Sequence, residues 1–184
     1  KLFDEFISEY SFLSISGKAR LRIALAYDLN AGDPKKVVRL YKDAINKSSM
    51  LDVRYEAKLR YVGFNVCRNK KMEDAEKETI SFLEATDAEK TNMTADHKKL
   101  LWLVRLRSMI NTHEFEDALA YLTTLPLDSL RLIERRALEA DGAEIVLGII
   151  QKAYLKGDFG RAVKVWELYK DKYENKVARN PYMN

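Results

Sequence analysis

Hydrophobic side chains recur along this chain three, four and seven positions apart, which is the spacing of amphipathic helices. No alternation of apolar and polar residues lasts beyond four positions, so the pattern indicates no strand. The sequence therefore predicts an all-α protein. Helices are expected over residues 1–16, 18–31, 34–47, 51–69, 72–86, 95–112, 115–124, 128–156 and 159–175.

Turn-forming residues separate these helical segments. Asp33 and Pro34 are typical of a helix N-terminus, with the aspartate as N-cap and the proline at the first helical position. Gly17 is expected to end the first helix, and Gly142 to divide or bend the longest one. Because the connections are short, consecutive helices should lie antiparallel. The predicted hairpins are 18–47, 51–86, 95–125 and 143–175, preceded by a helix at 1–16, with 126–142 as an extra or linking helix.

A small residue recurs at one place in the second helix of three hairpins, as Ala75, Ala118 and Ala162. Large side chains follow four and seven positions later, as Trp166 and Tyr169 in the last copy. We expect each alanine to lie where two helices approach closely, since a larger side chain would push them apart.

Two glycines, Gly63 and Gly148, lie inside predicted helices. Glycine costs about 1 kcal/mol relative to alanine in a helix interior, so we expect both to permit close packing against a partner helix. Repetition of this kind indicates stacked hairpins, each unable to bury its apolar face alone.

The repeated frame resembles the tetratricopeptide repeat. Val37 stands in the first copy where that family has alanine, and the small positions are 38, 43 and 44 residues apart instead of roughly 34. The resemblance implies a right-handed superhelical array of antiparallel hairpins, forming one domain over residues 1–184. The first-helix core positions of the last copy correspond to Val146, Ile149, Ile150 and Ala153, and those of the second to Leu59, Val62, Gly63 and Val66.

The run from Gly157 to Trp166, followed by Tyr173, is similar to repeats of bacterial cell-envelope and motility machinery. This resemblance implies a scaffold in such an assembly and a location in the periplasm or cell envelope, with the cytoplasm as the alternative. The chain begins at Lys1 without a methionine, so we expect it to be a piece of a longer protein.

Residues suited to catalysis or metal binding are not grouped in this sequence. His97 and His113 are 16 residues apart and have no Cys or Glu at metal-ligand spacing, so each is interpreted as a surface or capping residue. Acid pairs such as Glu73-Asp74 and Glu116-Asp117 fall at helix N-termini, where they complement the helix dipole. We predict no enzyme activity, no cofactor and no metal, and no apolar run is long enough to span a membrane.

The net charge of +4 is unevenly distributed. Residues 35–71 carry 11 basic and 3 acidic side chains, residues 72–96 carry 2 basic and 8 acidic, and residues 97–113 carry 4 basic and no acidic. Two interpretations stay open. The segments compensate one another between stacked helices, or the first of them forms a basic patch that attracts an acidic partner.

The resemblance also predicts a binding surface, because the first helix of each tetratricopeptide hairpin lines a concave groove. Arg60, Phe64 and Arg68 then form a stripe with an exposed aromatic side chain between two cations. Such a groove suits an acidic peptide or helix of a partner protein, with the segment 126–142 as the alternative face. The same surface is expected to continue through Arg105, Ser108, Gln151 and Tyr154.

These patterns favour a non-catalytic scaffold that binds other proteins. The alternative is a helical-repeat protein that binds nucleic acid through the basic segment 35–71, which a pI near 9.0 supports. The acidic segment that follows it counts against a phosphate-binding surface.

Overall fold

The computed structural model describes residues 5, 9, 14–30, 32–69 and 94–177. The chain divides into two compact units, residues 1–104 and 105–184. Every regular element in the described ranges is helical, and neighbouring helices pack together. The prediction of an all-α protein is confirmed.

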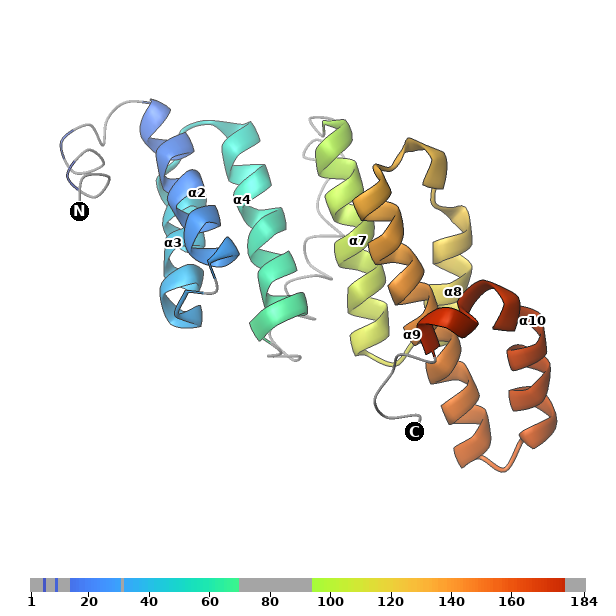
Figure 1. Cartoon of the computed structure of the whole chain (residues 1–184). Coiled ribbons are helices and arrows are strands. Elements are labelled where there is room, and N and C mark those ends of the chain that lie inside the picture. The colour runs from blue at the N-terminus through green and yellow to red at the C-terminus, as the bar shows by residue number, and fades with distance from the viewer. Residues whose placement is uncertain (1–4, 6–8, 10–13, 31, 70–93, 178–184) are drawn as a thin grey trace. The chain divides into compact units, whose positions relative to one another are not determined.

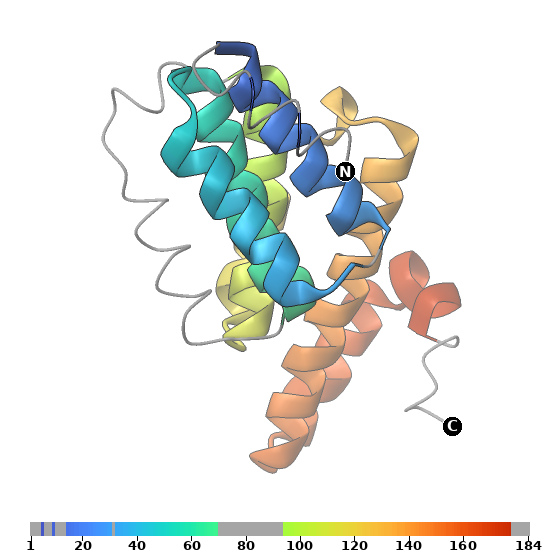
Figure 2. The same ribbon diagram turned by 90° about the vertical axis from the view of Figure 1, so that its left-hand side faces the viewer.

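The first unit contains three consecutive helices, α2 (Ser14–Leu29), α3 (Pro34–Lys47) and α4 (Leu51–Phe64). α3 packs against both α2 and α4, and the three lie side by side in both ribbon views (Figures 1 and 2). A π-helical turn, η1 (Asn65–Asn69), continues α4. The buried side chains of this cluster are Leu21, Ala24, Leu25, Val37, Tyr41, Ala44, Val53, Ala57, Tyr61 and Phe64.

α3 begins where its sequence predicts. The carboxylate of Asp33 accepts a hydrogen bond from the backbone N–H of Lys35 at 3.2 Å, and Pro34 occupies the first helical turn. An N-cap of this kind satisfies one of the donors that a helix start leaves open. The buried residues recur every three or four positions, so one face of α3 lies against the core.

The second unit is built around one long helix. α7 (Ala95–Asn111) crosses the boundary between the units, and α8 (Phe115–Thr124) follows it. A short 3₁₀ turn, η2 (Leu127–Ser129), leads into α9 (Leu132–Leu155), which packs against both α8 and the following α10 (Phe159–Val177). Buried Ala143, Val146 and Tyr173 form the core between α9 and α10.

Two glycines predicted to interrupt helices lie inside them, so Gly17 does not end a helix and Gly142 does not divide one. α2 starts at Ser14 and includes Gly17, and α9 runs through Gly142 without interruption. Each glycine is needed for a close contact instead. An added Cβ at Gly17 would lie 2.9 Å from the Cβ of Ser48, and one at Gly142 would lie 2.8 Å from the Cζ of Tyr173.

The turn between α7 and α8 and the turn between α9 and α10 close in the same way. His113 and Gly157, 44 positions apart, both have a positive φ, of 60° and 74°. In each turn the next backbone N–H donates to a carbonyl five residues back, from Glu114 to Met109 at 2.9 Å and from Asp158 to Ala153 at 3.0 Å. This is the Schellman ending of a helix, and a phenylalanine starts the next helix in both cases. The hairpin frame therefore repeats in the second unit.

The repeat positions of the sequence analysis take the following places. Ala118 and Ala162 are buried, and Ala75 lies outside the described residues, together with the expected helix over 72–86. Most of the expected helix over 1–16 also lies outside them, apart from residues 5, 9 and 14–16. An added Cβ at Gly63 would lie 3.2 Å from Val104 Cγ2, where α4 approaches α7.

Candidate functional site

The predicted stripe on α4 does not form an exposed aromatic surface, and Phe64 is the residue that contradicts it. Phe64 is only 5% exposed and belongs to the core of the first unit. Its ring lies 6.4 Å from that of Tyr41, centroid to centroid. α3 covers the side of α4 on which Phe64 lies, so the spacing of four residues marked a core position.

The two arginines of the stripe are engaged in ion pairs within the first unit. Arg60 Nε lies 2.8 Å from Glu56 Oε1, one turn earlier on α4. Arg68 lies 3.3 Å from Asp28 Oδ1 and also donates to the Asp28 carbonyl, which fixes η1 to the end of α2. Arg60 therefore pairs within α4, whereas Arg68 joins η1 to α2.

Asp28 also accepts a hydrogen bond from the Tyr41 hydroxyl at 2.7 Å. Burial raises the pKa of Tyr41 well above its usual value, and the neighbouring Asp28 carboxylate raises it further. Tyr41 is therefore a neutral hydrogen-bond donor that ties α3 to α2.

The remaining predicted partner-binding residues belong to the second unit. The Arg105 guanidinium lies 4.9 Å from the centroid of the Tyr121 ring. Burial raises the pKa of Tyr121, and Arg105 partly opposes that rise. Ser108 is half-buried, whereas Gln151 and Tyr154 are exposed. The structure thus leaves Gln151 and Tyr154 accessible, near the turn between α9 and α10. Trp166 and Tyr169 are half-buried against the core between α9 and α10.

The two histidines differ in their exposure to solvent. His97 is buried, so its predicted place at the surface is wrong: its ring lies 5.5 Å from that of Tyr55, and Nε2 lies 3.8 Å from Glu56 Oε2. The hydroxyl of Thr94 caps α7 by accepting from the His97 N–H at 3.2 Å. His113 is exposed at the end of α7. In the part of the chain that the structure describes, no three His, Cys, Asp or Glu residues lie close enough together to hold a metal ion.

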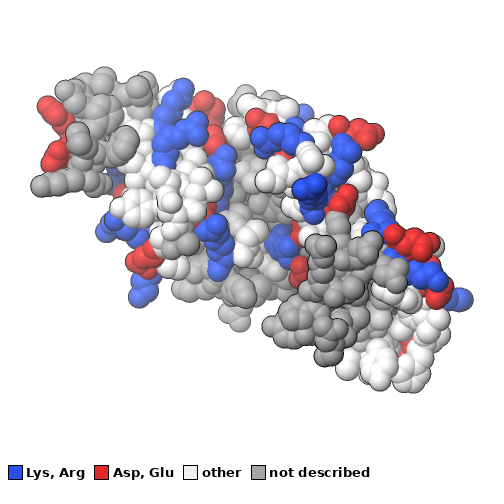
Figure 3. All heavy atoms as spheres, viewed as in Figure 1, with Lys and Arg blue, Asp and Glu red and all other residues white. Residues whose placement is uncertain are grey.

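Cations and carboxylates are interspersed on the face drawn in Figure 3. In the basic segment 35–71, Lys47 pairs with Asp43 at 3.0 Å, in addition to the pairs of Arg60 and Arg68 described above. Two of these pairs lie within one helix and the third joins η1 to α2, whereas most of the acidic segment 72–96, expected to compensate this one, lies outside the described residues.

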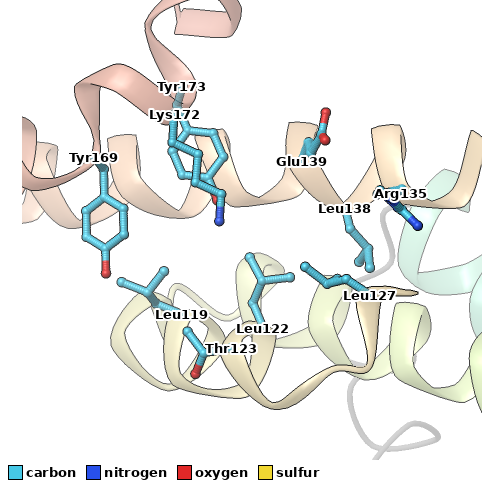
Figure 4. Close-up of a pocket in the computed structure, with 10 residues that line it drawn as sticks. All are labelled: Leu119, Leu122, Thr123, Leu127, Arg135, Leu138, Glu139, Tyr169, Lys172 and Tyr173. Carbon is cyan, nitrogen blue, oxygen red and sulfur yellow. The ribbon is translucent and has the colours of Figure 1, made fainter. Parts of the chain in front are cut away.

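An apolar groove in the second unit is the clearest candidate binding site. It encloses about 330 Å³ between α8, α9 and α10. Figure 4 shows leucine side chains of α8 and α9 converging on it, with Tyr169 at one end and Arg135 at the other. The lining residues are Leu119, Leu122, Thr123, Leu127, Arg135, Leu138, Glu139, Tyr169, Lys172 and Tyr173.

The groove has a buried apolar floor and a charged rim. Leu122, Leu138 and Tyr173 are buried, whereas Lys172 is exposed, with its ammonium 5.3 Å from the centroid of the Tyr173 ring. The Nε of Arg135 is buried and has no hydrogen-bond partner. A buried donor without an acceptor carries a desolvation cost of roughly 1–3 kcal/mol.

The sequence did not indicate this groove, although four of its residues fall in the segment 126–142 that was the alternative face. Leu119 and Leu122 are one turn apart on α8, and Tyr169 and Lys172 have the same spacing on α10. These spacings are visible in the sequence. They do not show that α9 lies between α8 and α10 and brings these two pairs of residues to one groove.

Comparison with family models, with curated proteins and with solved structures gives no match for this chain. No helix among the described residues combines the length and the apolar character that crossing a membrane requires.

Proposed function

We propose that this chain is a non-catalytic adaptor, built of tetratricopeptide-like stacked hairpins, that binds an acidic amphipathic helix of a partner protein. The binding site is the groove between α8, α9 and α10. The observation that carries the proposal is an apolar groove with the cations of Arg135 and Lys172 in its lining.

The apolar part of the groove sets the shape of the ligand. Its volume of about 330 Å³ is at the lower end of the range for ligand sites, roughly 300–1,000 Å³. The groove runs along helices, and a helix places apolar side chains along one face at every third or fourth position. Two consecutive leucine-type side chains of such a helix would fill the space above Leu122 and Leu138.

The charge of the rim determines the sign of the charge that a ligand must carry. Arg135 and Lys172 stand at the groove with one carboxylate, that of Glu139. A carboxylate on the ligand would pair with the cations of Arg135 and Lys172. Hydrogen bonds between charged groups are stronger than those between neutral groups, so this contact would select acidic partners.

A titration with a defined probe tests the proposal. The probe is a fluorescein-labelled 16-residue peptide with leucines on one helical face and glutamates on the other. We expect it to bind the wild-type chain and to bind the Arg135→Glu, Lys172→Glu double variant at least tenfold more weakly. Fluorescence anisotropy at low and at physiological salt measures both affinities, and higher salt should weaken wild-type binding.

The control is the Lys156→Glu, Lys164→Glu double variant. It changes the net charge equally and at exposed positions of the same unit, but neither residue lines the groove. Its affinity should stay within about threefold of the wild-type value. Equal losses in both double variants would mean general charge attraction and would reject the groove as the site.

A further inference from the structure

The end of the second unit carries a second apolar surface, separate from the groove. Tyr154, Phe159 and Val163 are 63%, 57% and 60% exposed. The rings of Tyr154 and Phe159 touch edge to face, with centroids 5.2 Å apart, and Val163 follows Phe159 by one helical turn. Large exposed apolar side chains gathered in this way are typical of interaction surfaces. Tyr154 at the end of α9, together with Phe159 and Val163 of α10, forms a surface that we call the α10 face.

The equivalent residues of α8 show how such a face is covered. Phe115 and Leu119 precede Phe159 and Val163 by 44 positions, and both pairs begin a helix that follows the same kind of turn. Yet Phe115 and Leu119 are half-buried. α9 is the helix that covers them.

A missing side chain on α9 makes this covering possible. An added Cβ at Gly148 would lie 2.5 Å from Cε2 and Cζ of the Phe115 ring. The ring of Phe115 therefore packs directly onto the α9 backbone at Gly148. Leu119 packs against the core that α9 forms with α10.

From this equivalence we infer that the α10 face binds an amphipathic helix of a partner protein, and that this helix presents a glycine or alanine to Phe159. The inference does not depend on the groove, because it rests on different residues and a different observation. The partner helix would lie on α10 as α9 lies on α8.

One difference between the two sites narrows the chemistry of the partner. Glu116 follows Phe115 and binds Lys152 of α9 at 3.2 Å, four residues after Gly148. The residue that follows Phe159 is Gly160, which offers no carboxylate. The partner helix therefore gains nothing from a cation at the position of Lys152.

The chain supplies a suitable probe for a direct test. The probe is a fluorescein-labelled peptide with the sequence of α9, residues 132–155, added to the intact chain. Phe159→Asp should weaken its binding at least tenfold, because the partner helix would have to cover a carboxylate. Leu168→Asp is the matched control. It changes an exposed leucine of the same helix, nine positions from Phe159 and so on the opposite side of α10, and it should change the affinity less than twofold.

A second probe tests the small residue itself. The same peptide with Gly148→Leu should bind the wild-type chain at least tenfold more weakly, since the added side chain would meet the Phe159 ring. The Lys172→Glu chain should bind the original peptide as the wild type does, which separates this site from the groove. Failure of the peptide to bind the wild-type chain would overturn the inference. So would equal binding by Phe159→Asp or by the Gly148→Leu peptide.

Discussion

At the scale of single residues, the described ionisable groups with the clearest roles join one helix to another. Arg107 near the end of α7 donates to Asp141 and, at 2.7 Å, to Glu144 Oε2, both on α9. Asp141 is buried, and its burial raises its pKa even though Arg107 acts in the opposite direction. The pair therefore fixes the end of α7 on α9 at an energetic cost.

The raised pKa of Asp141 predicts that the free energy of unfolding depends on pH. The folded chain holds the Asp141 proton more tightly than the unfolded chain, whose aspartates have a pKa of about 3.9. Asp141 therefore lowers the free energy of unfolding progressively as the pH rises from about 4 through its raised pKa. Asp141→Asn lacks this term, so the variant should gain stability relative to wild type over that interval. Urea unfolding at several pH values measures the difference, and a difference that does not vary with pH would contradict the account.

Among single residues, the sequence predicted the buried places of the small residues best. It predicted the exposure of Phe64 wrongly. An alanine four residues before an aromatic side chain in a predicted helix identifies a close contact by local spacing alone. Phe64 has the same kind of spacing between two arginines, but α3 covers it. Which face of a helix is covered depends on a neighbour that periodicity does not identify.

At the scale of elements, the repeated hairpin rests on buried alanines. Ala118 is completely buried on α8. Ala118→Leu should overpack that contact and lower the free energy of unfolding by roughly 1–3 kcal/mol. Ala120→Leu is the matched control, because Ala120 is exposed on the same helix. Thermal unfolding compares the two, and an unchanged midpoint for Ala118→Leu would contradict the packing of this hairpin.

Helix positions were predictable because their signals are local. The N-cap of Asp33 and the turn at Gly157 lie where the sequence placed them. Gly17 and Gly142 show the limit of that reasoning. A glycine that ends a helix and a glycine that admits a neighbouring side chain have the same local pattern, and only the position of Ser48 or Tyr173 tells them apart.

At the scale of the whole molecule, each of the two units has its own buried core, and the candidate site lies in the second unit. The segmented charge of the sequence suggested a basic surface in the first unit. There, Arg60 pairs with Glu56 of the same helix, and Arg68 joins η1 to α2 through Asp28. The groove forms where three helices meet, and no local sequence pattern predicts that these helices come together.

The central claim is that the groove between α8, α9 and α10 receives the partner helix, and methyl NMR of leucine-labelled protein tests it most directly. Addition of the acidic leucine peptide should shift the methyl resonances of the four groove leucines. It should leave those of Leu25 and Leu59, buried in the first unit, and of exposed Leu168 unchanged. Shifts confined to leucines outside the groove would contradict the claim. The four groove leucines are Leu119, Leu122, Leu127 and Leu138.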